Sequence, residues 1–566
     1  MSSSHPRPHP RRSGAQVLID QLRIHGTDTI FGVPGESYLA ALDALYAQRN
    51  SLRFIICRQE GGAANMAEAY GKLTGKPGIA FVTRGPGATN ASIGLHTGFQ
   101  DSTPMILLVG QVAREASDRE AFQEIDYRRM FGQMAKWVVQ IEDARRIPEL
   151  ISQAFHTALN GRPGPVVVSL PEDMLVDEVE VPDAGPYKIA RGAPAPEDMA
   201  KLRELLAAAE KPMVIVGGGG WTAQACADIR AFIEANDLPV CASFRNQDLF
   251  DNRHPNYAGD LGVGVGPALG KRLKACDLIV AVGPRLGEAT TGGYTLFDLP
   301  VPQQKLVHVH ASAEELGRVY QATLPINSGM ASFAAAAKAM KPVDGKRWKA
   351  ETAAAHAEYL DNIKPGPLPG AVNMGEVIAW LNKRLPDDAI VTNGAGNYAA
   401  FLHRFFQYRG FKTQLAPTSG AMGYGVPAAV AAKIAQPDRM VVSLAGDGCF
   451  LMNGQEFATA VQHGANIVIT VVDNGMYGTI RMHQEREYPT RVVGTDLKNP
   501  DFAAYARAFG GHGETVERTE DYAAAFERAV AAAKPAIIHV KTDPEALTSR
   551  ITLSKLREQA LAKQKH

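Results

Sequence analysis

Asp447 and Asn474 carry the oxygen groups that magnesium favours. Asp447 stands between Gly446 and Gly448, and Asn474 follows 27 positions after the aspartate. One carboxylate, an amide oxygen and the nearby backbone carbonyl of Met476, with room left for phosphate oxygens, make up a coordination set suited to Mg2+. Glycines on both sides of Asp447 let a diphosphate approach the backbone N–H groups of a helix start. These residue types therefore indicate a site for a metal ion and a diphosphate.

Apolar segments place these residues at one edge of a predicted sheet. We predict a strand over 440–444, a helix over about 453–462 and a second strand over 467–472. Parallel strands joined by a crossover helix end on the same side, so Asp447 and Asn474 should face one spot. A lone GDG sequence is more often an ordinary turn with a capping aspartate. The strands on both sides of this long spacing favour the metal–diphosphate site.

A second carboxylate, Glu60, precedes a glycine pair and a predicted helix in the segment RQEGGAANMAEAYG. An isolated carboxylate at such a helix start is most often a cap. Here it is followed by GPGATN at 85–90, another glycine-rich turn from strand to helix. Glu60 is therefore open to both interpretations, a cap or a functional acid.

Together these segments resemble the thiamine-diphosphate-dependent enzymes, and the region around Glu60 closely resembles the pyrimidine-binding domain of the acetolactate synthase group. The resemblance covers nearly the whole chain and implies thiamine diphosphate and Mg2+ as cofactors. In that family the glutamate matching Glu60 hydrogen-bonds N1′ of the aminopyrimidine. A carboxyl group in a water-poor pocket can share a proton with N1′ and so stabilise the imino tautomer of the aminopyrimidine. The family usually has a histidine just before it, whereas this chain has Gln59.

The resemblance also assigns four residues upstream of Asp447. Met422 matches the bulky apolar residue that supports the V-shaped cofactor, and the Gly420 carbonyl would accept from its 4′-amino group. Gly396 and Asn397 match a segment that contacts diphosphate, although synthases often carry Gln and His there. Without the resemblance, Met422 would be interpreted as a core residue.

Three residues bear on the substrate. Glu36 stands where acetolactate synthases usually have glycine and where pyruvate decarboxylase-like enzymes have a catalytic acid, so it either acts on an intermediate or faces solvent at a helix start. His483 replaces the tryptophan that shapes the acceptor pocket in true acetolactate synthases. Gln123 belongs to AFQEID, which matches a substrate-side loop, and is either a pocket residue or a surface amide.

The activity implied by the resemblance is decarboxylation of a 2-oxo acid followed by carboligation to a second carbonyl, of the acetolactate synthase type. Two alternatives stay open: a non-oxidative 2-oxo acid decarboxylase, and a related lyase that cleaves a carbon–carbon bond in a 2-hydroxyacyl or diketone substrate. An inactive nucleotide-binding homologue is a further alternative. It predicts loss of Glu60, Asp447 or Asn474, and all three are present.

FAD is a further expected group, structural rather than redox, because FAD-containing relatives use a central region with an arginine like Arg285. The glycine run at 216–220 is weak evidence for a nucleotide. In FAD-containing relatives a strand of this domain usually ends in acids, in the pattern H-x-D-x-D. The matching segment of this chain, HVHAS, has His310 and Ser312 instead. The sequence leaves the presence of FAD open.

Alternating helical and apolar strand patterns predict an α/β fold with three doubly wound parallel-sheet domains. The expected order is a disordered tail (1–12), a pyrimidine-binding domain (13–176), a linker (177–196), a central domain (197–340), a second linker (341–370), a diphosphate-binding domain (371–545) and a C-terminal tail (546–566). In relatives the tail covers the active site as a lid, while a solvated terminal helix is the alternative.

Composition restricts partners and location. The 59 basic and 59 acidic residues balance, so charge gives no reason to expect nucleic acid or a membrane as partner. No run of about 18 apolar residues occurs, so no membrane span is expected. The five scattered cysteines fit a reducing, cytoplasmic compartment. Because Glu60 and Asp447 fall in different domains, the resemblance implies that they meet across the subunit interface of a homodimer or homotetramer.

Overall fold

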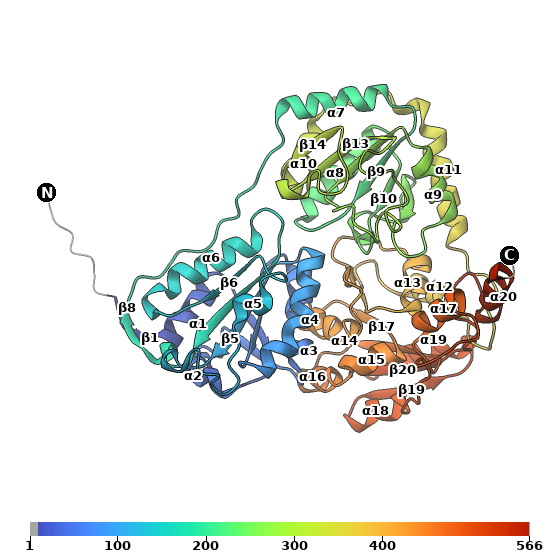
Figure 1. Ribbon diagram of the computed structural model, residues 1–566. Coiled ribbons are helices and arrows are strands. Elements are labelled where there is room, and N and C mark those ends of the chain that lie inside the picture. The colour runs from blue at the N-terminus through green and yellow to red at the C-terminus, as the bar shows by residue number, and fades with distance from the viewer. Residues whose placement is uncertain (1–8, 565–566) are drawn as a thin grey trace. The chain divides into compact units, whose positions relative to one another are not determined.

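The computed structural model describes residues 9–564 and divides into two compact units, one ending at Ala190 and the other beginning at Arg191 (Figure 1). The first unit contains one six-stranded parallel sheet in the order β3-β2-β4-β5-β7-β6. Its strands are β2 (Thr29–Gly32), β3 (Arg53–Ile56), β4 (Gly78–Val82), β5 (Met105–Gln111), β6 (Trp137–Gln140) and β7 (Pro165–Pro171). Its helices are α1 (Gly14–Ile24), α2 (Leu39–Ala47), α3 (Glu60–Thr74), α4 (Pro86–Asp101), α5 (Tyr127–Phe131) and α6 (Ile147–Leu159).

The first unit is doubly wound because both faces of its sheet are apolar. All residues of β4, β5 and β7 are buried, as expected for parallel strands covered on two sides. Helix α1 packs with α2 and α6, and α3 packs against α4. The apolar residues of α1 and α6 share one core cluster with Ile30, Ile79 and Leu108 of the sheet.

A short strand pair corrects part of the expected tail and linker. Residues 1–8 lie outside the described residues, but Arg11 and Arg12 belong to β1 (Arg11–Ser13) rather than to a disordered tail. β1 pairs antiparallel with β8 (Glu178–Glu180), inside the expected linker. Arg12 holds this pair to α1 through Asp20 at 2.7 Å and is bonded to Asp183 at 2.8 Å. The proline-rich composition concealed this pairing, which depends on residues more than 160 positions apart.

The second unit contains two six-stranded parallel sheets. The central sheet has the order β11-β10-β9-β12-β13-β14. Its strands are β9 (Pro212–Val216), β10 (Val240–Ala242), β11 (Tyr257–Asp260), β12 (Leu278–Val282), β13 (Lys305–His310) and β14 (Leu324–Asn327). The surrounding helices are α7 (Pro196–Ala208), α8 (Ala223–Ala235), α9 (Pro267–Ala275), α10 (Met330–Ala339) and α11 (Lys349–Asn362).

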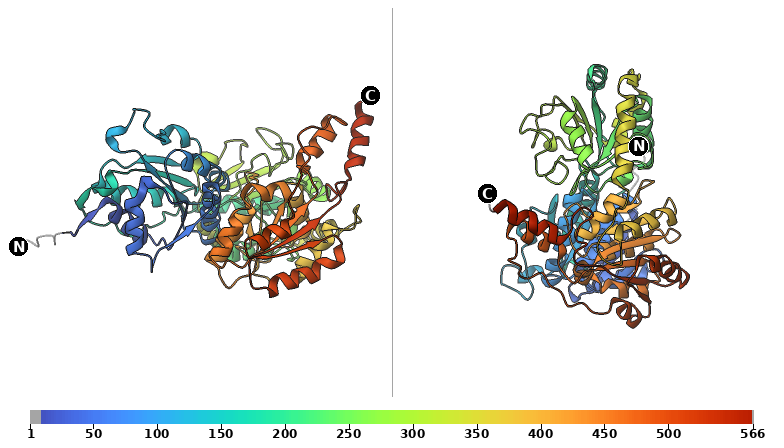
Figure 2. Two further views of the ribbon diagram at one scale, coloured as in Figure 1. Left: turned by 90° about the horizontal axis from the view of Figure 1, so that it is seen from below. Right: turned by 90° about the vertical axis from the view of Figure 1, so that its right-hand side faces the viewer.

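The third sheet has the order β16-β15-β17-β18-β20-β19. Its strands are β15 (Ile390–Asn393), β16 (Gln414–Leu415), β17 (Val441–Gly446), β18 (Val468–Asp473), β19 (His512–Val516) and β20 (Ala536–Lys541). Its helices are α12 (Met374–Arg384), α13 (Asn397–Phe405), α14 (Gly425–Ala435), α15 (Asp447–Asn453), α16 (Glu456–Gln462), α17 (Gly478–Glu487), α18 (Phe502–Ala508), α19 (Tyr522–Ala531) and α20 (Leu553–Gln564). Figure 2 shows α20 alongside α17, and the two helices pack together.

Short 3₁₀ turns connect several of these elements: η1 (Glu36–Tyr38), η2 (Arg114–Ala116), η3 (Ala144–Arg146), η4 (Met174–Val176), η5 (Gln247–Leu249), η6 (Ala313–Glu315), η7 (Gly345–Arg347) and η8 (Thr519–Asp521).

The three parallel sheets confirm the predicted α/β fold class. The predicted helix over 453–462 is wrong in its start, because α15 already begins at Asp447 and a break before α16 follows. The domain boundaries stay predictions. No helix in residues 9–564 is both long and apolar enough to cross a membrane.

Candidate active site

A cavity of about 230 Å³ lies at the carboxyl edge of the third sheet. Neighbouring strands β15, β17 and β18 end there, as parallel strands must, and α13, α15 and α17 begin there. The cavity brings together every residue of this unit that the sequence assigned to the metal or the cofactor, namely Gly396, Asn397, Gly420, Met422, Gly446, Asp447, Gly448, Asn474 and Met476.

Helix starts supply this cavity with N–H groups. Gly396 and Gly446 are the N-cap residues of α13 and α15 and have no side chain that could accept from them. Tyr477 precedes α17, and its side chain makes no capping hydrogen bond in the described structure. The first N–H groups of a helix lack partners within the helix and carry partial positive charge. The cavity is therefore suited to an anion such as a diphosphate.

Aromatic rings press against the two glycines that flank Asp447. A Cβ atom on Gly446 would lie 2.7 Å from the Tyr398 ring, and one on Gly448 would lie 2.5 Å from the Tyr477 ring. Neither glycine has a positive φ, so the need for glycine here comes from space. The two glycines therefore make room for the Tyr398 and Tyr477 rings beside Asp447.

Asp447 lies at the bottom of the cavity and is only 3 % exposed. Its Oδ1 accepts from the Gly448 N–H at 2.9 Å, and its Oδ2 accepts from Asn499 Nδ2 at 2.8 Å. Burial raises the pKa of Asp447 to about 6, and the neighbouring Asp473 contributes in the same direction. A bound cation would favour the ionised form, since an opposite charge stabilises a buried carboxylate.

Asp473 is the acid that the sequence interpretation missed. Its Oδ1 accepts from Asn499 at 2.7 Å and its Oδ2 contacts His539 Nε2 at 2.8 Å. Although burial opposes it, the hydrogen bond from His539 lowers the pKa of Asp473 to about 2. Its position directly before Asn474 at the end of an apolar strand was a usable signal. Asn499 lies in a loop without periodicity, and nothing in the sequence pattern indicates it.

Asn474 follows β18 in a turn whose next residue, Gly475, has φ 68°. The amide oxygen of Asn474 accepts from the Met476 N–H at 3.2 Å. An amide oxygen has two lone pairs, so this bond leaves one for a cation. Met422 lines the same cavity and packs, half-buried, against the core of this domain.

The C-terminal segment closes against the same region. Leu547 lines the cavity and clusters with Met476 and Leu553. Helix α20 is bound to α17 by Arg557, which donates to the buried Glu485 at 2.7 and 2.5 Å. His483 lies on the exposed side of α17, where its Nδ1 is 2.5 Å from Arg486 Nη2, and it does not line this cavity.

Glu60 is the first residue of α3 in the first unit. The N-cap is Gln59, whose Oε1 accepts from the Gly62 N–H at 3.1 Å. Glu60 is therefore not the side-chain cap of this helix. Instead its Oε2 accepts from Asn90 Nδ2 at 2.9 Å, which fixes the carboxylate between the two glycine-rich turns. Burial, with a smaller contribution from Glu60, raises the pKa of the neighbouring Tyr38.

Glu36 and Gln123 also lie in the first unit. Glu36 begins η1 and is exposed. Gln123 has φ 66°, and its carbonyl oxygen would lie 2.7 Å from a Cβ atom on Gly85, so its backbone packs on the turn before α4. The AFQEID loop is thereby held beside the GPGATN segment.

Three parallel sheets and a cavity lined by helix N-termini at a sheet edge are the arrangement expected of an enzyme that holds a diphosphate cofactor. Family models agree in three places: "Thiamine pyrophosphate enzyme, N-terminal TPP binding domain" matches 12–130, the central domain matches 199–337 and the C-terminal TPP binding domain matches 394–540. The chain belongs to the thiamine pyrophosphate enzyme family.

Curated relatives match almost end to end. The acetolactate synthase isozyme 2 large subunit of Escherichia coli is 31% identical over 94% of this chain and 96% of its own length. The acetolactate synthase large subunit of Parasynechococcus marenigrum is 33% identical, covering 91% of this chain and 86% of the relative. That of Corynebacterium glutamicum is 31% identical, covering 92% and 85%.

Proposed function

We propose that this enzyme decarboxylates a 2-oxo acid and joins the remaining fragment to a second carbonyl compound, as the acetolactate synthase type does. The observation that carries this proposal is similarity to acetolactate synthase large subunits along nearly the full length of both chains. Non-oxidative decarboxylation, or cleavage of a 2-hydroxyacyl or diketone substrate, is the second candidate. It is favoured by Glu36 and His483, which replace the usual synthase residues.

The cavity residues fit thiamine diphosphate and Mg2+. The open N–H groups of α13 and α17 would bind the diphosphate, and Asp447, Asn474 and the Met476 carbonyl would hold Mg2+. When bound, thiamine diphosphate supplies an electron sink for breaking the bond to carbon dioxide.

The protein's own groups supply binding, orientation and proton transfer. Met422 would support the bent cofactor from below, and the Gly420 carbonyl would accept from its amino group. Glu60 would share a proton with the pyrimidine nitrogen, and Asn90 positions the Glu60 carboxylate for this role. Gln123, Glu36 and His483 stay predicted substrate residues, and of these His483 lies on the exposed side of α17 outside the cavity.

FAD stays a prediction, and the central sheet offers it a poor fit. A dinucleotide in such a sheet lies in the crevice between the loops after β9 and β12. Those loops touch: a Cβ atom on Gly218 would lie 2.0 Å from the Gly283 carbonyl oxygen. Trp221 is buried beside them and donates its indole N–H to the Gly217 carbonyl at 2.8 Å. We therefore derive no catalytic role from FAD.

We propose a homodimer or homotetramer, with Glu60 of one subunit completing the cofactor site of its partner, and a cytoplasmic location. The location is supported by the five free cysteines, of which Cys57, Cys241 and Cys449 are buried. A reducing compartment preserves such thiols.

The function is tested by incubating the enzyme with pyruvate, thiamine diphosphate and Mg2+ and identifying the products. Acetolactate with release of carbon dioxide is the expected result. Acetaldehyde without acetolactate would show that the enzyme catalyses simple decarboxylation and not carboligation. A panel of longer 2-oxo acids, alone and in pairs, would then define the donor and the acceptor.

A further inference from the structure

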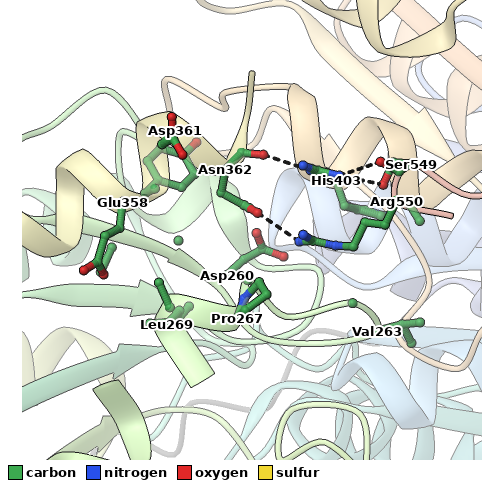
Figure 3. Close-up of a pocket in the computed structure, with 18 of the residues that line it drawn as sticks. Asp260, Val263, Pro267, Leu269, Glu358, Asp361, Asn362, His403, Ser549 and Arg550 are labelled. Carbon is green, nitrogen blue, oxygen red and sulfur yellow. Dashed lines mark hydrogen bonds between the residues drawn. The ribbon is translucent and has the colours of Figure 1, made fainter. Parts of the chain in front are cut away.

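A second and larger cavity lies in the same unit, between the central domain and the diphosphate-binding domain. Figure 3 shows part of its lining, and its volume is about 750 Å³. The walls come from the end of β11, the start of α9, the last turns of α11, the outer side of α13 and the segment 548–551. Asn397 lines both cavities, and its Nδ2 lies 3.5 Å from Met482 Sδ, so these two side chains form part of the partition.

Two guanidinium groups in this cavity have only neutral partners. Arg404 donates to the Asn362 carbonyl at 2.8 Å and to the Ser549 carbonyl at 2.7 Å. Arg550 donates to Asn362 Oδ1 at 2.9 Å. Within residues 9–564 neither arginine has a carboxylate within 4.0 Å. By contrast, Arg272 in the same cavity is paired with Glu351 and Glu358.

The two arginines differ in exposure, since Arg404 is partly buried and Arg550 is exposed. Burial, and then the charge of Arg550, lowers the pKa of Arg404 to about 10. Burial also lowers the pKa of Arg550. Asn362 accepts from both arginines and so keeps two like charges close together, and a bound anion would stabilise them. Guanidinium groups prefer carboxylates and phosphates, whose oxygens match their forked N–H donors.

Part of the remaining wall is apolar, and Asp260, Glu358 and Asp361 also line the cavity. Val263, Pro267, Leu269, Met482 and Ile551 give it an apolar wall. Pockets of about 300–1,000 Å³ enclose ligands far larger than a short 2-oxo acid. This volume therefore exceeds what the proposed substrates require.

Asp260, at the end of β11, adds one polar group to the same cavity. Burial raises the pKa of its carboxyl group to about 7, so near neutral pH it both donates and accepts hydrogen bonds. Such a group suits the edge of a heterocyclic ring, where donors and acceptors stand side by side.

We propose that this cavity binds a phosphate-bearing organic molecule of nucleotide size, with its phosphate on Arg404 and Arg550 and its ring against the apolar wall. The site is separate from the thiamine diphosphate cavity. It does not depend on which carbonyl compounds the enzyme joins.

The probe for this site is ADP, titrated calorimetrically into holoenzyme already saturated with thiamine diphosphate and Mg2+, so that the first cavity is filled. We expect saturable binding that weakens at least tenfold in Arg404→Gln and in Arg550→Gln. Arg404→Lys, which keeps the charge, should retain part of the affinity. Arg203→Gln is the matched control, because Arg203 also donates to a carbonyl, that of Lys341, but lies outside the cavity.

Two further probes separate the parts of the ligand. Adenosine and inorganic pyrophosphate should each bind at least tenfold more weakly than ADP, since each lacks one half of the proposed contacts. ADP should also slow tryptic cleavage after Arg550, because the bound phosphate would hold that side chain. This readout uses the unmodified chain and does not depend on variants that fail to fold.

Absence of ADP binding would overturn the proposal. Equal affinity of wild type, Arg404→Gln and Arg550→Gln would do the same, as would pyrophosphate binding as tightly as ADP. None of these results would alter the expected formation of acetolactate from pyruvate, so the two proposals fail separately.

Discussion

Asn499 donates one amide hydrogen to Asp447 and the other to Asp473, at 2.8 and 2.7 Å. Asp447 directly follows β17 and Asp473 ends the neighbouring strand β18, so their carboxylates would otherwise repel each other across the sheet edge. A single neutral side chain thus fixes the orientation of the expected metal ligand and separates it from its acidic neighbour.

Asn499→Ala should weaken the Mg2+-dependent binding of thiamine diphosphate by about 10–100-fold, the usual effect of removing a group that orients a metal ligand. The change leaves Asp447 in place but frees its carboxylate. Mg2+ titration followed by circular dichroism in the presence of thiamine diphosphate measures it. Asn382→Ala, which removes an amide bonded to Gln407 in the same domain, is the control. Equal Mg2+ dependence in both variants would exclude the positioning role.

Gly448→Ala should weaken thiamine diphosphate binding by at least about tenfold, or 1.4 kcal/mol. The added Cβ atom would lie 2.5 Å from the Tyr477 ring, which must move into the space at the start of α17. Gly410→Ala is the matched control, because the nearest atoms to its Cβ would be 4.0 Å away and it has no positive φ. Fluorescence titration with thiamine diphosphate compares the two. Unchanged affinity in Gly448→Ala would show that this backbone does not face the diphosphate.

The expected metal ligands that line this cavity can be found in the sequence because each of them lies near the end of a recognisable apolar strand. Asp447 and Asn474 follow apolar strands, and the topology of parallel strands brings such ends together without further information. Asn499 was missed because a loop residue carries no periodic signal, and its role follows only from how the chain returns to the sheet edge. The cavity around Arg404 and Arg550 was missed for a similar reason. Its residues come from two domains and the C-terminal segment.

Glu60→Gln should slow hydrogen exchange at C2 of bound thiamine diphosphate by about 100-fold, the typical contribution of one acid–base group. Its affinity for the cofactor should change little, since the diphosphate contacts belong to the other domain. Exchange is followed by NMR after acid quench, and affinity by titration. Glu115→Gln, an exposed glutamate of the same unit, is the control. Exchange as fast as in wild type would remove Glu60 from proton transfer.

Docking of α20 on α17 should weaken in acid. The hydrogen bond from Arg557 lowers the pKa of the buried Glu485 to about 2. A carboxyl group whose pKa is lowered in the folded state stabilises that state at pH values above its ordinary pKa of 4.5. This stabilisation is lost as the pH falls toward the folded-state pKa of about 2. Hydrogen–deuterium exchange of α20, corrected for intrinsic rates, should therefore rise between pH 5 and pH 3. At pH 7, Glu485→Gln should show the faster exchange, while Glu487→Gln on the same helix should not.

Asp260 should give the opposite pH dependence. Burial raises the pKa of Asp260 from 3.8 to about 7, so the folded state binds the proton more tightly than the unfolded chain does. Stability should then fall as the pH rises from about 4 to 7, by at most about 1.4 kcal/mol per pH unit. The thermal midpoint, followed by tryptophan fluorescence, to which Trp221 and Trp348 in the core around the central sheet contribute, measures this effect.

Asp260→Asn should flatten that pH dependence, because the amide does not titrate and fits the same space. Asp361→Asn is the matched control, since Asp361 lines the same cavity but is exposed. A midpoint that falls equally between pH 5 and pH 7 in wild type and Asp260→Asn would show that the Asp260 carboxyl is already ionised in the folded protein. The cavity would then present a fixed negative charge opposite its arginines, and a bound phosphate would have to avoid that side.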